Sequence, residues 1–539
     1  MPILSWLGKE KVVNHHQQVP YRVLEAQYVH GQAECGNMLI HGDNLDALKS
    51  LLPRYEGKVK CVYIDPPYNT GNEGWVYNDN VNDPKIRKWL GEVVGKEGED
   101  LSRHDKWLCM MYPRLKLLQR LLAEDGAIFI SIDDIELSNL KMICNEIFGT
   151  SNFVCQFTWK TSGNFDNQAK IKICHEYILF YGKNAATLGL PQAIDPSIPE
   201  TSKLYKGEIR NTVVKNGAKN PMSKITLPIG FPCSEQKMIV TRRFDKFPYF
   251  HNDAIIFDWR LTNEVVIESG WGSKDVLMDF IESGFQSVFD SKGQMTRFEI
   301  TASGAIELIK TRDKISHVIS VLTELGSTQN MSTELKKMGI VFDFPKPVQL
   351  VQYLTSFYCG ENDILLDSFA GSGTTAHAVL NMNKNDGGNR KFILIEMENY
   401  AEAITAERIK RVINGYGDTE GTGGGFAYYE LGDRLLFENS NLNETLAVEK
   451  IREYVWYTET RSDYTPQEEA YLLGLRANTA YYFYYEKQRV TVLDHDFLNA
   501  VKTKAGSYLI YADINTLSAK EMDAANIRFK KIPRDITKL

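Results

Sequence analysis

Residues 59–68 read VKCVYIDPPY, and residues 364–375 read ILLDSFAGSGTT. Each stretch begins with an apolar run of the kind that forms a buried strand, and each ends in a turn of proline or glycine. Polar residues that directly follow buried strands lie at the carboxyl edge of a parallel sheet, where α/β proteins bind their ligands. The two stretches therefore predict an α/β fold whose functional site lies where these strands end.

Further strands and helices alternate with these two stretches. Apolar runs at 38–41, 127–132 and 392–395 predict strands, whereas leucines and methionines at helical spacing predict a helix over 107–122. A second helix is expected over 135–148. This alternation is typical of βαβ units, so we expect a doubly wound, mostly parallel sheet.

The middle and the end of the chain differ from this pattern. Residues 183–300 are rich in proline, asparagine, glycine and aromatic residues without a sustained period, which predicts a β-rich or irregular insert. Residues 414–425 are glycine-rich and typical of a linker, and helices are expected after it at 446–456 and 466–477. The expected divisions are an N-terminal extension (1–36), two halves of the α/β domain (37–182 and 340–413), an insert (183–339) and a small C-terminal α+β domain (426–539).

Asp65-Pro66-Pro67-Tyr68 is the strongest candidate for chemistry. The two prolines fix the backbone and remove two N–H donors, so the Asp65 carboxylate and the Pro66 carbonyl can both accept hydrogen bonds from one planar amino group. Such bonds shift an exocyclic amine towards an attacking geometry, and Tyr68 offers a flat face for an aromatic base. A rigid turn after a core strand would by itself explain the same tetrapeptide.

The second candidate is the glycine-rich turn at 367–375, where the backbone can approach a bound cofactor closely. Thr374 stands where a phosphate loop has lysine, and Ala376 stands where a dinucleotide fingerprint has glycine, so neither pattern is met. Glu396, at the end of the next strand, is placed to accept hydrogen bonds from ribose hydroxyls. A nucleoside without phosphates fits this combination, and S-adenosylmethionine is such a molecule.

Composition and charge narrow the class of protein. The 539 residues carry a net charge of −7, yet residues 151–250 hold 14 Lys+Arg against 7 Asp+Glu. A basic middle is typical of a DNA-contacting insert, although a solvated lysine-rich surface gives the same count. The eight cysteines are scattered and the histidines lack metal-ligand spacing, so we expect reduced thiols and no metal. Without a membrane-length apolar run or a secretory pattern at the start, a cytoplasmic protein is expected.

Together the two turns resemble the amino-methyltransferases of DNA. DPPY resembles that family's catalytic motif and FAGSG its cofactor motif, and their order, catalytic motif first, resembles that of β-class N6-adenine enzymes. HEYILFY at 175–181 resembles a late strand of the catalytic half. Asp43 resembles the residue that contacts the cofactor's adenine ring, and Lys346-Pro347 resembles the segment that closes over its methionine end.

The resemblance implies a circularly permuted, seven-stranded methyltransferase sheet. It implies catalytic roles for Asp65, Pro66, Pro67 and Tyr68. The cofactor-binding residues that it implies are Asp43, Lys346, Pro347, Asp367, Phe369, Ala370, Gly371, Ser372, Gly373, Thr374 and Glu396.

The chain is more specifically similar to the Mod subunits of type III restriction–modification systems, through DPPYNTG at 65–71, YNDN at 77–80, HAV at 377–379 and DGGNR at 386–390. This implies a bacterial or archaeal, nucleoid-associated homodimer that binds double-stranded DNA and pairs with a helicase-nuclease (Res-type) subunit. The insert would recognise the target and help to flip one base. Its candidate DNA contacts are Lys203, Lys206, Arg210, Lys215, Lys219, Lys224, Arg242, Arg243 and Lys246.

Several alternatives stay open at this point. N4-methylation of cytosine uses the same geometry, although Asp rather than Ser at the first motif position favours adenine. A recognition-only subunit that delivers a nuclease partner would need neither motif. Methylation of RNA or of a protein amide follows the same chemical logic, and the basic insert favours DNA. A C5-cytosine enzyme needs a Pro-Cys nucleophile, and Pro232-Cys233 lies inside the insert, away from a strand end.

Overall fold

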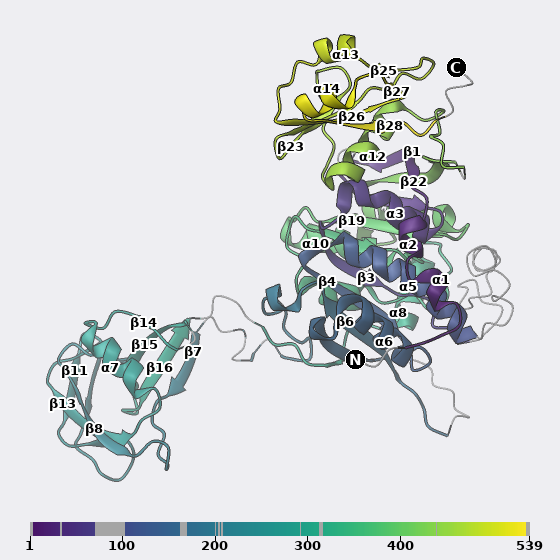
Figure 1. Cartoon of the computed structure of the whole chain (residues 1–539). Helices are drawn as coiled ribbons and strands as arrows, with labels where there is room; N and C mark the ends of the chain where they lie inside the picture. Colours follow the sequence, from purple (N-terminus) through teal and green to yellow (C-terminus); the bar gives the residue numbers. More distant parts are fainter. Residues whose placement is uncertain are drawn as a thin grey trace. The chain divides into compact units, whose positions relative to one another are not determined.

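The structure is a computed structural model. It describes residues 4–32, 35–70, 103–161, 170–199, 201–202, 205, 208–291, 293–311, 316–437 and 439–534. The chain forms two compact units, one of Met1–Ala193 with Val318–Leu539 and one of Ile194–His317 (Figure 1). In the described residues, no helix is both long and apolar enough to cross a membrane.

A ten-stranded, mostly parallel sheet is the centre of the first unit (Figure 1). Strands β22 to β4 run parallel, whereas β1 and β6 run antiparallel to their neighbours. The strand order is β1 (Arg22–Gly31), β22 (Gly425–Arg434), β2 (Met38–His41), β19 (Lys391–Glu396), β18 (Ile364–Asp367), β3 (Val59–Ile64), β4 (Leu122–Ile132), β6 (His175–Gly182), β5 (Phe153–Lys160) and β17 (Val321–Leu322). The expected α/β class with a mostly parallel sheet is confirmed.

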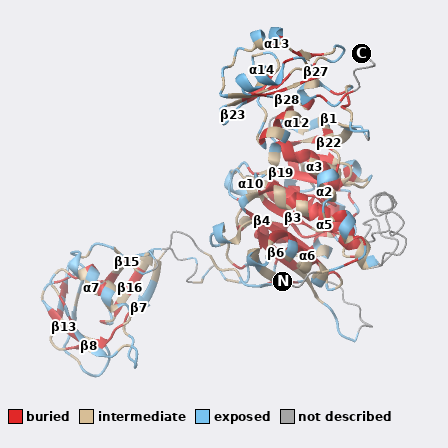
Figure 2. Ribbon diagram, viewed as in Figure 1, coloured by how far each residue is buried: buried red, intermediate tan, exposed pale blue. Residues whose placement is uncertain are grey.

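Both faces of this sheet are buried, which explains why its strands are almost continuously apolar. In β4, Ile128, Ile130 and Ile132 belong to one core, whereas Ala127 and Phe129 belong to the other. Successive side chains of a strand point to opposite faces, so each strand contributes to both cores. Buried residues accordingly concentrate around the sheet in Figure 2.

Two sets of helices cover the two faces. The first core includes residues of α3 (Asn44–Tyr55), α5 (Arg103–Leu121) and α6 (Leu137–Phe148), and the second includes residues of α8 (Thr328–Lys337), α9 (Val348–Ser356), α10 (Thr374–Asp386) and α11 (Glu407–Asn414). The remaining short helices of this part are α1 (Lys9–Val12), α2 (His15–Gln18), η2 (Thr150–Asn152), η3 (Ala185–Thr187) and the π-helical turn η5 (Ala401–Ala406). The sheet is therefore doubly wound, as expected.

The sheet is wider than the seven strands expected, because it recruits segments from both ends of the chain. Strand β1 comes from the expected N-terminal extension, and β22 comes from the expected C-terminal domain. The glycine-rich stretch before β22 is not a plain linker, since β20 (Gly415–Tyr416) and β21 (Thr419–Glu420) pair within it. Backbone pairing between such distant segments leaves no mark in the local pattern from which strands are predicted.

The last part of the first unit has a second, smaller sheet. Helix α12 (Val448–Thr460) lies where a helix was expected, but the helix expected at 466–477 is wrong, because this segment contains a strand, β23. Pairing with β24 overrides the helical propensity of its leucines and alanines. The other elements are β23 (Leu472–Arg476), β24 (Thr479–Phe483), β25 (Val492–Leu493), α13 (His495–Ala500), β26 (Ser507–Ala512), β27 (Ile514–Asn515), α14 (Ala519–Ala524) and β28 (Ile527–Lys531).

The second unit is β-rich and has its own core. The sequence placed the insert at 183–339, and the compact unit lies inside those limits, at Ile194–His317. Its core includes Phe231, Phe250 and Trp271. The elements are β7 (Glu208–Thr212), β8 (Met222–Leu227), β9 (Lys237–Val240), β10 (Tyr249–Phe250), β11 (Ala254–Phe257), β12 (Arg260–Leu261), β13 (Val265–Gly270), α7 (Lys274–Glu282), β14 (Val288–Phe289), β15 (Met295–Ile300) and β16 (Ile306–Thr311).

Candidate functional site

A cavity opens at the carboxyl ends of β3 and β18. These strands are parallel neighbours, with Leu365 opposite Cys61, so the turns that follow them come together at one edge of the sheet. The residues that line the cavity are Tyr63, Asp65, Pro66, Tyr68, Thr70, Glu176, Phe342, Asp343, Phe344, Pro345, Lys346, Asp367, Phe369, Ala370, Gly371, Ser372 and Thr374. Two turns separated by almost 300 residues thus form one site.

Some of the candidate residues do not line the cavity. Pro67, Pro347, Gly373, Glu396 and Asp43 are outside its lining. The carbonyl of Pro67 accepts a hydrogen bond of 2.7 Å from the indole nitrogen of Trp107, which fixes the DPPY turn on α5. Of the four DPPY residues, the structure therefore places three in the cavity wall and uses the fourth to anchor the turn.

Lys346 lies at the centre of the cavity's charged groups. Its Nζ is 2.9 Å from Asp65 Oδ2 and 3.3 Å from Glu176 Oε2, and it lies 4.8 Å from the centre of the Tyr68 ring. Burial by itself would lower the pKa of Lys346, but Asp65 and Glu176 outweigh burial and raise that pKa. The ammonium group is therefore paired with both carboxylates in the wall of the cavity.

Glu176 is a site residue that the sequence did not single out. Its Oε2 also accepts a hydrogen bond of 3.0 Å from the Tyr68 hydroxyl. It lies near the start of β6, and because β6 runs antiparallel to β4, the start of β6 reaches the carboxyl edge of the parallel strands. The HEY stretch was visible in the sequence, but the direction of its strand was not.

We expect Lys346→Met to lower the free energy of unfolding by about 2 kcal/mol, because it leaves two partly buried carboxylates together without a cation. The pKa of Lys346 is raised, so its contribution is fully present below the ordinary lysine value and is lost only in strong alkali. The loss should therefore be the same at pH 6 and pH 9 in urea unfolding. Lys58→Met, which removes an exposed pair with Asp463, is the control and should change stability by less than about 1 kcal/mol. Equal effects of the two substitutions would contradict this prediction.

The glycine-rich turn is held from behind by Glu396. The amide of Gly371 donates a hydrogen bond of 2.7 Å to one carboxylate oxygen, and the amide of Glu398 donates one of 2.9 Å to the other. Burial raises the pKa of Glu396 to about 8. In this structure the carboxylate positions the turn, and contact with a ribose remains a prediction.

Asp367 presents a second buried carboxyl group to the cavity. Its oxygens accept hydrogen bonds from the Phe369 amide at 3.0 Å and from the Thr375 hydroxyl at 2.6 Å. Burial raises the pKa of Asp367 to about 7 despite these two bonds. The group therefore gains or loses its charge near neutral pH.

Behind the turn, the buried guanidinium of Arg408 donates hydrogen bonds to Ser372 Oγ at 2.7 Å and to Thr374 Oγ1 at 2.9 Å. Burial lowers the pKa of Arg408 to about 10. The Thr374 hydroxyl donates in turn to the carbonyl of Lys346 at 3.2 Å. These bonds tie α11, the glycine-rich turn and the Lys346 segment into one wall.

Asp43 follows β2, two strands away from β18 in the sheet. Its Oδ1 accepts hydrogen bonds from the amides of Leu45 at 2.8 Å and Asp46 at 3.1 Å, so it caps helix α3. Its Oδ2 lies 3.5 Å from a guanidinium nitrogen of the buried Arg114. The structure gives Asp43 a role in the fold, and its contact with the cofactor's adenine ring remains a prediction.

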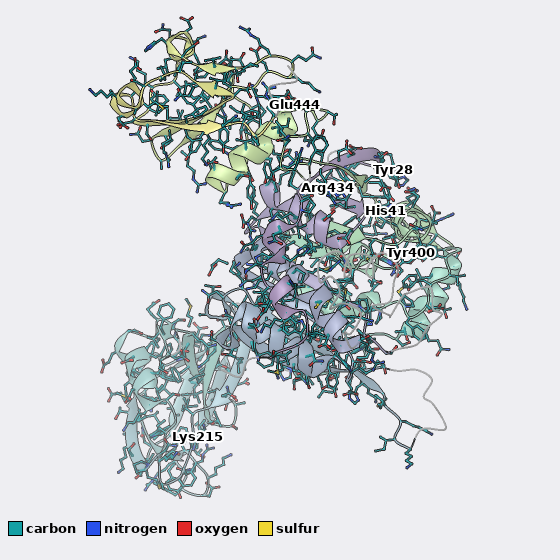
Figure 3. The ribbon with its side chains drawn as sticks, turned by 45° about the vertical axis from the view of Figure 1, so that its right-hand side comes forward. Tyr28, His41, Lys215, Tyr400, Arg434 and Glu444 are labelled. Atoms are coloured by element: carbon teal, nitrogen blue, oxygen red, sulfur yellow. The ribbon has the colours of Figure 1, made fainter. Side chains whose placement is uncertain are left out.

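The candidate DNA contacts fall into three groups. Lys203 and Lys206 lie outside the described residues. Arg210 is paired with Glu299, Glu208 and Glu307, and Arg243 donates to the Ser303 carbonyl while its guanidinium lies 4.9 Å from the Phe250 ring. The other five candidates are exposed and form no ion pair among the described residues: Lys215 (labelled in Figure 3), Lys219, Lys224, Arg242 and Lys246. These five are better placed for phosphate contacts than Arg210 and Arg243, whose guanidinium groups contact other groups of the second unit.

The DNA methylase family matches this chain over residues 59–407. The chain belongs to the DNA methylase family. The match contains both turns of the cavity, the Glu176 strand and the second unit.

The chain is also similar to individual proteins of restriction–modification systems. It is 35% identical over 423 residues to the type III EcoPI Mod subunit of Escherichia phage P1, covering 73% of this chain and 63% of the relative. It is 32% identical over 437 residues to the type III EcoP15I Mod subunit of Escherichia coli, covering 73% and 64%. The chain thus spans less than two thirds of the length of these two relatives.

The chain is also similar to two other methyltransferases. The type II methyltransferase M.KpnI of Klebsiella pneumoniae is 29% identical over 375 residues, covering 66% of this chain and 79% of the relative. Among solved structures, the cytosine-N4-specific PvuII DNA methyltransferase is similar with a TM-score of 0.33 and 12% identity, covering 72% of this chain and 89% of that chain.

Proposed function

We propose that this DNA methylase is a site-specific DNA methyltransferase that transfers a methyl group from S-adenosylmethionine to adenine N6 in double-stranded DNA. The observation that carries the proposal is the cavity in which the DPPY turn faces the glycine-rich turn. A base held by the first turn and a cofactor held by the second would meet in that space. The reaction would be a direct in-line attack by a flipped base.

The residues of the DPPY turn suit the acceptor base. The Asp65 carboxylate and the Pro66 carbonyl can each accept a hydrogen bond from the exocyclic amine, and Tyr68 can stack on the ring. Lys346 holds Asp65 Oδ2 in this structure, so the arriving amine must share that carboxylate or displace the ammonium group. The protein contributes position and exclusion of water, without a covalent enzyme intermediate.

The charge of the cavity suits the cofactor. Asp65, Glu176, Asp343 and Asp367 line it together with a single cation, Lys346, among the described lining residues. Such a site favours a ligand with positive charge and disfavours phosphates. S-adenosylmethionine carries positive charge on its amino group and sulfonium, and it supplies an electrophilic methyl group when bound. Asp367, the glycine-rich turn and Lys346-Pro347 are the residues that would hold it, with Glu396 and Asp43 reaching its nucleoside.

We expect the affinity for S-adenosylmethionine to rise roughly tenfold between pH 6 and pH 8. The pKa of Asp367 is about 7, so the carboxylate that attracts a cationic ligand forms over this range. In the absence of ligand, the raised pKa means that the folded state binds a proton at Asp367 more tightly than the unfolded state does. The free energy of unfolding should therefore fall as pH rises from about 4 to 7. Calorimetric titration of the purified chain measures the affinity, and Asp367→Asn should flatten its pH profile. A profile unchanged by that substitution would exclude Asp367 as the titrating group.

The likeness to the two Mod relatives supports a more specific role, as the modification subunit of a type III system. In this role the chain would have the permuted, catalytic-half-first order of β-class enzymes, and the insert, including the unit at Ile194–His317, would recognise the target. It would act on DNA in the cytoplasm, at the nucleoid, as a homodimer, and would pair with a Res-type helicase-nuclease. The exposed basic side chains of the second unit support contact with phosphates.

Modification-sensitive long-read sequencing tests the function. Genomic DNA from a methylation-deficient host that expresses the chain should carry N6-methyladenine on one strand of one short asymmetric motif. N4-methylcytosine in a single motif would support the proposed mechanism but would show that the substrate base is cytosine and not adenine. An unmodified genome, with soluble protein present, would contradict methylation of DNA by this chain alone and would favour a recognition-only subunit. The family match and the intact pair of turns favour a methylated genome over an unmodified one.

A further inference from the structure

A second cavity lies at the opposite edge of the sheet from the candidate active site. It opens between α2, α3, α5 and α12, near the ends of α3 and α5 that lead into β3 and β4. The active-site turn at Asp65 follows the carboxyl end of β3, at the other end of the sheet's strands. The linings of the two cavities have no residue in common. The lining of the second cavity is His16, Gln17, Tyr21, Lys49, Leu52, Arg120, Tyr454, Tyr457, Thr458 and Arg461.

Three cations from three elements converge on this cavity. Lys49 Nζ donates to the backbone carbonyls of His16 at 3.0 Å and Gln17 at 2.9 Å. Arg120 pairs with Glu56 at 2.6 Å and donates to the Tyr457 hydroxyl at 3.1 Å. The guanidinium of Arg461 lies 5.0 Å from the centre of the Tyr457 ring. Among the ion pairs of the described residues, Glu56 is the one carboxylate that pairs with any of the three.

The local potential is accordingly positive. Burial, together with Arg120 and Arg461, lowers the pKa of Lys49 to about 8, and Glu56 acts in the other direction. Burial also lowers the pKa of His16 to about 4, helped by Lys116, Arg120 and Lys49. Three cations around a single paired carboxylate, Glu56, leave an excess of positive charge that a bound anion would stabilise.

The shape and the walls of the cavity indicate which anion. Guanidinium groups hold phosphate oxygens through paired hydrogen bonds, and an ammonium group adds a point charge. The rings of Tyr21 and Tyr454 lie 4.9 Å apart in the wall. Both tyrosines also line an adjoining cavity that extends to Arg434 (labelled in Figure 3) and Phe437. A ligand larger than one phosphate could therefore continue along aromatic surface.

We propose that this cavity binds the phosphate group of a nucleotide or of a nucleic-acid backbone, between Lys49, Arg120 and Arg461. The site is separate from the methyl-transfer cavity and lies where α12 of the C-terminal part packs against α3. Its occupation would neutralise the three cations and would strengthen the contact between these two helices.

The test is phosphate binding by the full chain. Thermal unfolding is followed with increasing sodium phosphate, at an ionic strength held constant with sodium chloride, and affinity is measured by calorimetry. We expect Arg461→Gln and Lys49→Met each to weaken phosphate binding by about tenfold or more. Arg476→Gln, an exposed arginine of the same C-terminal part outside the cavity, should leave it unchanged. The general stabilising effect of phosphate on proteins is then common to all variants and cancels.

An equal response to phosphate in all four proteins would overturn the proposal, and so would the absence of binding by the wild type. Competition by adenosine monophosphate or by a short single-stranded oligonucleotide then separates the two sources of the phosphate. Displacement mainly by the mononucleotide would identify a nucleotide site, and displacement mainly by the oligonucleotide would identify a backbone contact. Either identification requires that the displacement be lost in Arg461→Gln, because this substitution lies outside the methyl-transfer cavity.

Discussion

Asp65→Ala is expected to abolish methyl transfer while leaving cofactor binding largely intact. The substitution removes the side chain that would accept a hydrogen bond from the target amine, and loss of such a group costs about 100-fold or more in rate. Asp65 lines the cavity and pairs with Lys346, whereas the glycine-rich turn is held by the bond from the Gly371 amide to Glu396, in which Asp65 takes no part. The cofactor's turn should therefore keep its shape.

The measurement is methyl incorporation into DNA together with calorimetric titration of S-adenosylmethionine. Asp125→Ala is the matched control, since Asp125 pairs with Lys60 on the surface, outside the cavity. It should retain both properties. If Asp65→Ala lost methyl transfer and cofactor binding together, Asp65 would be a structural residue and its catalytic assignment would be wrong.

Gly371→Asp and Gly373→Asp are each expected to block cofactor binding. The backbone φ angles are +52° at Gly371 and +83° at Gly373. Residues other than glycine adopt such angles only with strain of about 1–2 kcal/mol. A Cβ at Gly373 would lie 3.3 Å from Thr405 Cγ2 and 3.4 Å from the Thr405 carbonyl. A carboxylate at either position would also crowd the turn that Glu396 holds in place.

Gly387→Asp is the control for these two variants. Gly373 directly precedes helix α10, and Gly387 directly follows it. Gly387 has a φ of +73°, but a Cβ there meets nothing within 4 Å. It should show similar backbone strain and an unchanged cofactor titration. Unchanged titrations in Gly371→Asp and Gly373→Asp would remove the glycine-rich turn from the cofactor site, whatever their effect on stability.

The chain's own pattern predicted most of the site because its parts are short and local. The DPPY and FAGSG turns each follow an almost continuously apolar strand, and strands β3 and β18 lie where that pattern placed them. A parallel sheet then places both turns at one edge, and the pairing of β18 with β3 brings them together. The two turns and the edge of the sheet on which they lie could thus be predicted without knowing how the rest of the chain folds.

The residues that complete the site could not be found in this way. Glu176 reaches the cavity because β6 runs against its neighbours. Lys346 was named through the family resemblance as a cofactor residue, but its pairing with Asp65 depends on the path of its segment. Strand direction and the path of a connecting segment follow from packing over the whole domain. A local pattern of side chains contains neither.

By itself, the amino-acid sequence determined the α/β class, the two turns and the basic character of the middle of the chain, since each depends on neighbouring residues. Only the tertiary structure decided that β1 and β22 widen the sheet, that residues 466–477 contain a strand, and that Lys49, Arg120 and Arg461 share a cavity. The physical reason is the same in each case. Backbone pairing and the gathering of charge depend on residues that are distant in the chain, and their energies are set only when those residues meet.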